Sequence, residues 1–226
     1  MTRKAIVTGH SRGLGAALSA RLARAGWEVL GISRSAGVRI DLSDPAQWCG
    51  WLVGPELESF LAGAEEVLLI NNAGTVEPIG TGGVAPEQVA GAFQVNVCAA
   101  ISLTDAVLSR RPEGCPARIV HISSGAGRRP IEGWSVYCAT KAALDMHAQV
   151  VAAERLPGVR IAAVAPGVVD TGMQETIREC DFPLRNHFRD LKKNGELLSP
   201  DEAARSLLAL LDRDDFGQRV LTDIRG

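Results

Sequence analysis

The chain has 226 residues, of which 46% are hydrophobic and 22% are charged, and its formal net charge is −2. This apolar content allows a sizeable core. The near-neutral charge, without a concentrated basic run, argues against nucleic acid as the main partner. We expect no membrane partner, because no apolar run reaches the ~18–20 residues of a span. A strand-like run starts at Ala5, so we expect no signal peptide.

The five cysteines are widely spaced and form neither a C-x-x-C pair nor a disulfide framework. A reducing, cytoplasmic setting is the simplest one for such a chain. We expect no metal site.

Strand-like and helix-like segments alternate along the chain. Short apolar runs predict strands at 5–7, 29–32, 38–41, 67–70, 118–122, 159–164 and 219–222. Helical periodicity predicts helices at 14–25, 45–61 with a break near Gly54-Pro55, 86–108, 135–154, and 200–211 after an N-cap at Ser199. Strands that are apolar on both faces and separated by helices imply a parallel sheet covered on both sides. We therefore predict one α/β domain over 1–226, with a doubly wound, Rossmann-type parallel sheet of about seven strands.

The segment 168–198 breaks this alternation. It is long and mixed in charge, and it follows the end of a predicted strand. Ligands of open α/β sheets bind at that edge, and long insertions there often act as lids. We expect this segment to cover a substrate.

A glycine-rich turn, Thr8-Gly9-His10-Ser11-Arg12-Gly13-Leu14-Gly15, joins the first strand to the first helix. Glycines allow a tight turn and a close approach to a pyrophosphate, which the helix N-terminus attracts. The spacing is G-x-x-x-G-x-G instead of the commoner G-x-G-x-x-G, and an ordinary turn is the alternative. The predicted dinucleotide contacts are Gly9, Ser11, Arg12, Gly13, Leu14 and Gly15.

The end of the second strand indicates which dinucleotide binds. An acidic residue there would bind a ribose hydroxyl and repel a 2′-phosphate, but residues 29–37 contain neither Asp nor Glu. They contain Ser33 and Arg34, and Arg12 lies in the glycine-rich turn. Guanidinium groups and small hydroxyls suit a phosphate, which favours NADP(H) over NAD(H). The alternative is that Arg34 is a solvated surface residue.

Tyr137 is the only tyrosine, and Lys141 follows it by one helical turn. A phenol has a pKa of about 10, and a neighbouring ammonium favours the phenolate and lowers that pKa. The pair is a plausible acid–base device, although Y-x-x-x-K is weak evidence alone. Ser124 follows the fifth predicted strand, and a loop can bring it to Tyr137.

Two amide-bearing positions add to this pattern. Asn72, with Ala73 and Gly74, follows the strand at 67–70, where it shapes an adenosine pocket or forms a plain Asx turn. Asn96 lies inside the helix at 86–108, where a buried amide is costly unless it is used. A structural hydrogen bond is the alternative role for Asn96.

Together these motifs resemble the short-chain dehydrogenase/reductase family, in which T-G-x-x-x-G-x-G, N-N-A-G, a helix Asn, paired Ser, Y-x-x-x-K and P-G occur in this order. The resemblance implies that Ser124 binds a substrate carbonyl oxygen and that Tyr137 exchanges the proton. It implies that Lys141 lowers the pKa of Tyr137 and holds the nicotinamide ribose, and that Asn96 supports a water relay. A homodimer or homotetramer is expected by the same resemblance.

The resemblance also completes the cofactor site. Asp41 is expected at the adenine and Thr171 at the nicotinamide amide. The remaining contacts are Leu42, Asn72, Ala73, Gly74, Pro166, Gly167 and Val169. One departure from the family is the segment between Arg34 and Val38, which is too short for the usual helix, so we expect a more open adenine side.

The C-terminal third is similar to sepiapterin reductases and bacterial benzil (diketone) reductases, in G-W-S-V-Y-C-A, A-P-G-V-V-D-T and Met173-Gln174. Asp223 falls where those reductases place an acid that anchors a pterin; an exposed tail carboxylate is the alternative. The implied substrate contacts are Ser124, Trp134, Tyr137, Gly167, Met173 and Asp223. We predict an NADPH-dependent reductase of a compact ketone or vicinal diketone. The alternatives are an alcohol dehydrogenase of the same family with another substrate class, or a non-catalytic NADP-sensing protein.

Overall fold

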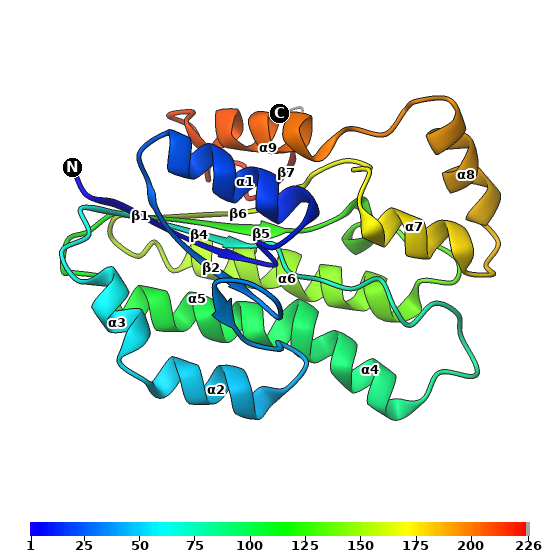
Figure 1. The fold of residues 1–226 in the computed structure, drawn as a ribbon, viewed down its shortest axis with the longest axis horizontal. Helices are drawn as coiled ribbons and strands as arrows, with labels where there is room; N and C mark the ends of the chain where they lie inside the picture. Colours follow the sequence, from blue (N-terminus) through cyan, green and yellow to red (C-terminus); the bar gives the residue numbers. More distant parts are fainter. Residues whose placement is uncertain (225–226) are drawn as a thin grey trace.

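The computed structural model describes residues 1–224, which contain one seven-stranded sheet (Figure 1). The strands are β1 (Arg3–Thr8), β2 (Glu28–Ser33), β3 (Val38–Arg39), β4 (Glu66–Asn71), β5 (Ala117–Ile122), β6 (Val159–Ala165) and β7 (Leu221–Asp223). All neighbours pair in parallel, in the order β3-β2-β1-β4-β5-β6-β7. The predicted doubly wound Rossmann-type sheet is therefore confirmed. The strand order reverses between β1 and β4, and ligands bind outside the carboxyl ends of strands at such a point.

Helices cover both faces of the sheet (Figure 1). One face carries α1 (Gly13–Arg24) and α9 (Pro200–Leu211), and the other carries α2 (Pro45–Val53), α3 (Glu56–Leu61), α4 (Pro86–Phe93), α5 (Ala99–Arg110) and α6 (Ser135–Ala153). Each face has its own cluster of buried apolar side chains. The two clusters explain why the strands read as apolar on both faces.

The helix that begins at Pro86 contains an irregularity that the periodicity did not predict. Between α4 and α5, Gln94–Cys98 forms a π-helical turn, η1. Such turns are rare and often mark functional sites. This one contains Asn96, which is only 1% exposed.

The same continuous helix, Pro86–Arg110, is long and apolar enough to cross a membrane by length and composition alone. The expectation that no stretch reaches that length is therefore wrong. Half of its most apolar window is buried inside the fold, where Leu103 and Val107 belong to the core beneath the sheet. A core helix meets the same criteria of length and composition.

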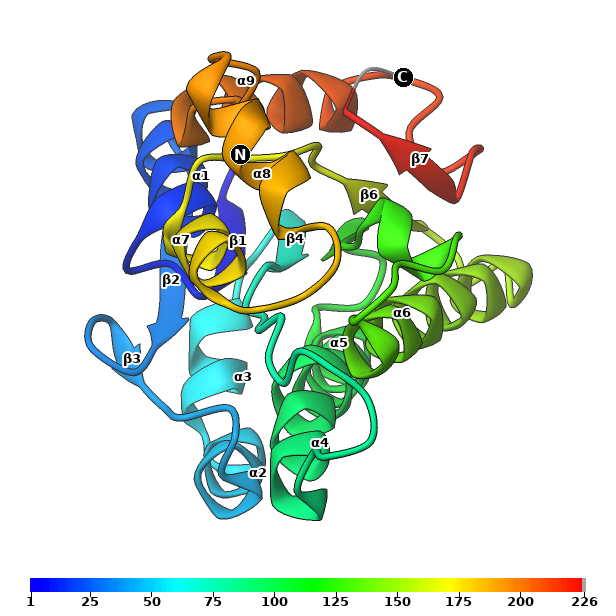
Figure 2. The same cartoon turned by 90° about the vertical axis from the view of Figure 1, so that its right-hand side faces the viewer.

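The segment 168–198 lies beyond the carboxyl edge of the sheet and contains α7 (Gly172–Glu179) and α8 (Arg185–Lys193) (Figure 2). Its two ends are joined, because Asp170 N donates to Leu198 O at 2.8 Å and Leu198 N donates to Val168 O at 3.0 Å. Lys192 forms an ion pair with Asp170. The segment is therefore closed at its base, and its role as a substrate cover stays a prediction.

Candidate active site

An open cleft of about 1900 Å³ runs along the carboxyl edge of the sheet. Residues of the predicted dinucleotide site and of the predicted catalytic site both line this cleft. The lining residues include Gly9, Ser11, Arg12, Gly13, Leu14, Ser33, Arg34, Asp41, Leu42, Asn72, Ala73, Gly74, Ser124, Trp134, Tyr137, Lys141, Pro166, Gly167, Val169, Thr171, Met173 and Asp223. Gly15 and Asn96 are not part of the lining.

The glycine-rich turn forms a cradle that side chains would fill. Gly9 and Gly13 have φ of 67° and 55°, in the region that favours glycine. A Cβ on Gly15 would lie 2.3 Å from Gly9 O and 2.6 Å from Asn72 Nδ2. No side chain caps α1, and its first turn has no acidic residue, so its N–H groups and positive dipole end suit an anion. These residues fit the pyrophosphate of a dinucleotide.

The end of β4 is fastened to the end of β1 beside this cradle. Thr8 Oγ1 accepts from Asn72 N at 3.0 Å and from Ala73 N at 2.9 Å. The Asn72 side chain donates to Thr8 O at 2.9 Å. The Asn72 amide thus holds neighbouring backbone, which agrees with a role in shaping the adenosine pocket. Its partner, Thr8, was not indicated by the sequence.

On the adenine side, a tight turn takes the place of a helix between β2 and β3. Ser33 Oγ donates to Ala36 O at 2.8 Å and accepts from Ala36 N at 3.0 Å. His10 Nε2 also donates to Ala36 O, at 2.9 Å. A Cβ on Gly31 would lie 2.3 Å from the His10 ring, so glycine makes room for this imidazole. The described chain has no helix between Arg34 and Val38, as the short segment predicts. The Ser33 hydroxyl makes its hydrogen bonds within the turn.

The charged groups of this side remain directed to the cleft. Arg12 and Arg34 are both exposed and line it. Hydrogen bonds from the backbone and hydroxyl of Ser43 lower the pKa of Asp41, and the charge of Arg34 lowers it further. Ser33 lines the cleft as well, so its contact with a phosphate stays a prediction beside those of the two guanidinium groups.

At the other end of the cleft, α6 presents Tyr137 and Lys141 on one face, with exposed fractions of 7% and 3%. The Lys141 Nζ atom lies 5.6 Å from the centre of the Tyr137 ring and donates to Ile122 O at 2.8 Å. Ser124 hydrogen-bonds to the Tyr137 hydroxyl, and its own Oγ accepts from Ala126 N at 3.1 Å. Three of the four predicted catalytic side chains therefore converge, and Asn96 is the fourth.

Burial controls the protonation of this group. It raises the pKa of Tyr137 to about 12, against the opposing hydrogen bond from Ser124. It lowers the pKa of Lys141 to about 8, against the opposing charge of Asp145. Lys141 is not among the causes that shift the pKa of Tyr137, so the expectation that Lys141 lowers this pKa stays a prediction. Tyr137 holds its proton, which is the form that a proton donor needs.

Asn96 lies behind Lys141 and uses its whole amide. Its Oδ1 accepts from Thr75 N at 2.8 Å, and its Nδ2 donates to Thr75 O at 2.8 Å and to Thr140 Oγ1 at 3.0 Å. A Cβ on Gly74 would lie 3.3 Å from Asn96 Oδ1 and 3.6 Å from Lys141 Nζ. The geometry shows the structural hydrogen bonds of Asn96, and the water relay stays a prediction.

Aromatic side chains form the wall next to Tyr137. The Trp134 ring meets Tyr137 edge-on at 5.4 Å between centroids and stacks on Phe182 and Phe188 at 5.8 Å and 5.3 Å. Both phenylalanines come from the segment 168–198, and Met173 packs against this cluster. The wall is apolar and partly supplied by the segment that follows β6.

Asp223 lies at the end of β7, where it pairs in register with Ala165 of β6. The alternative that Asp223 is a carboxylate on an exposed tail is therefore wrong. The structure also shows an ion pair that the sequence did not indicate, between Arg128 and the buried Asp145. The available signal was the position of Asp145, four residues after Lys141 on the same buried face of α6.

Comparisons with known proteins agree with this geometry. The family model for short chain dehydrogenases matches residues 65–181. Benzil reductase ((S)-benzoin forming) of Bacillus cereus is 35% identical over 96% of this chain and 96% of its own. Sepiapterin reductase of Meriones unguiculatus is 38% identical over 93% and 92%.

Solved structures are similar over the whole chain. A short-chain dehydrogenase/reductase from Burkholderia vietnamiensis is 41% identical, with a TM-score of 0.72 over 99% of this chain and 97% of its own. A short-chain dehydrogenase from Sphingobium yanoikuyae in complex with NADPH is 25% identical, with a TM-score of 0.78 over 98% and 87%. The chain belongs to the short-chain dehydrogenase/reductase family, whose members are NAD(P)-dependent oxidoreductases that act on CH–OH or C=O groups.

Proposed function

We propose that this protein is an NADPH-dependent carbonyl reductase that acts on a compact ketone or vicinal diketone. One observation carries the proposal: Ser124, Tyr137 and Lys141 converge in a cleft whose other end is an uncapped, glycine-lined helix N-terminus. That arrangement combines a dinucleotide cradle with a proton donor.

Bound NADPH would supply the hydride. Ser124 and Tyr137 would both hydrogen-bond to the carbonyl oxygen, where negative charge develops. Because burial raises the pKa of Tyr137 to about 12, this side chain enters the reaction protonated and donates its proton to the alkoxide. The Lys141 ammonium, 5.6 Å from the ring, stabilises the phenolate that remains.

The choice of NADPH rests on charge. Arg12 and Arg34 line the adenine end, and no acidic residue lies between 29 and 37 to repel a 2′-phosphate. The NADPH complex of the Sphingobium relative supports this choice by similarity. A cytoplasmic location and a homodimer or homotetramer stay predictions.

The substrate class rests on the walls of the cleft. Trp134 and Met173 form an apolar side that suits a flat ring. Asp223, at the end of β7, adds an acceptor for N–H groups. The names of the relatives, benzil reductase and sepiapterin reductase, both describe reduction of such compounds.

The test is an NADPH-oxidation screen over pterins, vicinal diketones and simple ketones, with Tyr137→Phe as the matched variant. The wild type should reduce at least one of the first two classes. Tyr137→Phe should bind NADPH normally, measured by fluorescence, and lose turnover by about 10²–10⁴-fold. Near-normal turnover in the variant would exclude the proposed proton donor, and reduction of simple ketones alone would favour another activity within the family.

A further inference from the structure

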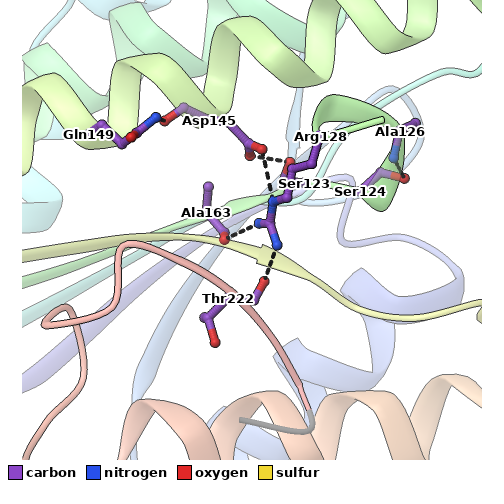
Figure 3. A network of polar contacts seen from close by, with 8 residues as sticks. All are labelled: Ser123, Ser124, Ala126, Arg128, Asp145, Gln149, Ala163 and Thr222. Carbon is purple, nitrogen blue, oxygen red and sulfur yellow. Dashed lines mark hydrogen bonds and ion pairs between the residues drawn. The ribbon is translucent and has the colours of Figure 1, made fainter. Parts of the chain in front are cut away.

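A cluster of polar and charged side chains joins α6 to the turn after β5 (Figure 3). It consists of Ser123, Arg128 and Asp145. Ser123 Oγ donates to Asp145 Oδ1, and Arg128 Nε donates to Asp145 Oδ2 at 3.0 Å. Ser123 is 2% exposed and Asp145 is 4% exposed, so the carboxylate is satisfied by protein groups on both oxygens.

The guanidinium of Arg128 extends this cluster to two strands. Its Nη1 donates to Thr222 O in β7 at 3.1 Å, and its Nη2 donates to Ala163 O in β6 at 2.9 Å. Figure 3 shows the Arg128 side chain between Asp145 of α6 and these two carbonyl groups. One side chain therefore joins the turn after β5 to a helix and to the edge of the sheet.

Each end of the cluster adjoins a residue of the proposed site. Ser123 immediately precedes Ser124, and Thr222 immediately precedes Asp223. Asp145 follows Lys141 by one turn of α6. Asp145 is buried and Arg128 is exposed, and an ion pair is by itself weak evidence for stability. Because its partners adjoin Ser124, Asp223 and Lys141, the Arg128–Asp145 pair is placed to affect the reaction.

We propose that Asp145 is a positioning residue: through Ser123 and Arg128, it fixes Ser124 and the strand that carries Asp223 relative to Tyr137 and Lys141. This inference rests on the proposed function. The two hydrogen bonds of Asp145 are separate, because one carboxylate oxygen accepts from Ser123 and the other accepts from Arg128.

The carboxylate also acts on the charge of Lys141. Burial lowers the pKa of Lys141 to about 8, and the charge of Asp145 opposes this effect. The other titratable groups that face Lys141 are Tyr137 on its own helix and His121 on β5, and Arg128 faces Asp145 from the turn.

Neither of those facing groups supplies a negative charge near neutral pH. Burial raises the pKa of Tyr137 to about 12 and lowers the pKa of His121 to about 3, so both are uncharged there. Of the groups named, Asp145 supplies the negative charge that keeps Lys141 an ammonium.

The test begins with a readout that needs neither cofactor nor substrate. The chain has four lysines, Lys4, Lys141, Lys192 and Lys193, so carbon-13 NMR of labelled lysine can follow each side chain through a pH titration. Asp145→Asn keeps the size of the side chain and removes its charge. The Lys141 titration should move to lower pH by about one pH unit, and the alkaline limb of kcat for diketone reduction should move with it.

Ser123→Ala is the matched control. It removes one hydrogen bond to the carboxylate and leaves the Asp145–Arg128 pair in place. The Lys141 titration should stay where it is in the wild type, while kcat falls about tenfold because Ser124 is less well held. If Asp145→Asn fails to fold, the double variant Asp145→Asn/Arg128→Met removes both charges and leaves neither unpaired, and its Lys141 titration should also move to lower pH.

The outcomes separate the two proposals. An unchanged kcat in Ser123→Ala overturns the positioning role, and an unmoved Lys141 titration in a folded Asp145 variant overturns the effect of Asp145 on the charge of Lys141, while the reductase activity stands. A wild type that reduces no carbonyl compound overturns the proposed function, and with it the role of Asp145 in that reaction, even where the titration moves.

Discussion

Replacement of Lys141 by methionine should make the protein more stable near pH 7 while it abolishes turnover. Methionine has a similar length and no charge, so it fills the same buried volume. The lysine is only 3% exposed, and its Nζ has one hydrogen-bond acceptor, Ile122 O at 2.8 Å. An ammonium in such a place is retained for its chemistry, at the expense of stability.

The magnitude follows from the pKa of Lys141, which burial lowers from 10.5 to about 8. Each unit corresponds to about 1.4 kcal/mol, so the charged lysine costs the folded state about 3 kcal/mol. The variant loses the hydrogen bond to Ile122 O, which is worth about 1 kcal/mol. The net gain in the free energy of unfolding is about 2 kcal/mol, or about 4–8 °C in Tm for a chain of this size.

The pH dependence gives the sharper test. Below pH 8 the lysine is protonated in both the folded and the unfolded state, and the full cost is present. Between about 8 and 10.5 the folded protein releases its proton first, so wild-type stability rises relative to the variant. Above this window the wild type should be the more stable of the two, by the hydrogen bond alone.

Urea denaturation of both proteins near pH 7 and again above pH 10.5 measures this reversal. Lys193→Met is the control, since that lysine is exposed on α8 and its removal should give no pH-dependent difference. A Lys141→Met protein that is less stable than the wild type near pH 7, or a difference that does not change with pH, would refute the reasoning.

Three further predictions concern the cofactor and the substrate. Gly15→Ala places a Cβ 2.3 Å from Gly9 O, so the turn must shift and NADPH affinity, measured by fluorescence, should fall at least about tenfold; Gly50→Ala, which meets no atom within 4 Å, should leave it unchanged. Arg34→Leu should lower kcat/KM with NADPH by about 10–100-fold and leave that with NADH unaltered, whereas equal losses with both would argue against a phosphate contact. Asp223→Asn should raise KM for pterins far more than for benzil-like diketones, because the amide accepts fewer N–H hydrogen bonds; equal changes would assign Asp223 a structural role only.

The parts of the site that the sequence predicted depend on local geometry. The glycine-rich turn requires positive φ at Gly9 and Gly13, which is a property of single residues. Tyr137 and Lys141 share a face because they are one helical turn apart. Both features depend on residues that are close in the sequence, so their spacing is enough to predict them.

The parts that the sequence did not predict depend on distant contacts. The pKa of Tyr137 is set by burial, and the side chains packed around Tyr137 include Phe182 and Phe188 from the distant segment 168–198. The Ser33 hydroxyl bonds within its own turn because the usual helix is missing there. The Arg128–Asp145 pair joins two elements that become neighbours only when β5, β6 and α6 have assembled.

The π-helical turn at Gln94–Cys98 has a consequence for how this protein tolerates changes in length. One additional residue in a helical turn rotates everything after it by about 100°. The turn lets Ala92 line the cleft while Leu103 and Val107, further along the same helix, face the core. Deletion of one residue here would make the helix regular but turn one of these two faces away from its partner. Single-residue insertions and deletions should therefore be excluded from this helix, in contrast to the shortened loop after Arg34, where the chain omits a whole helix and keeps its sheet.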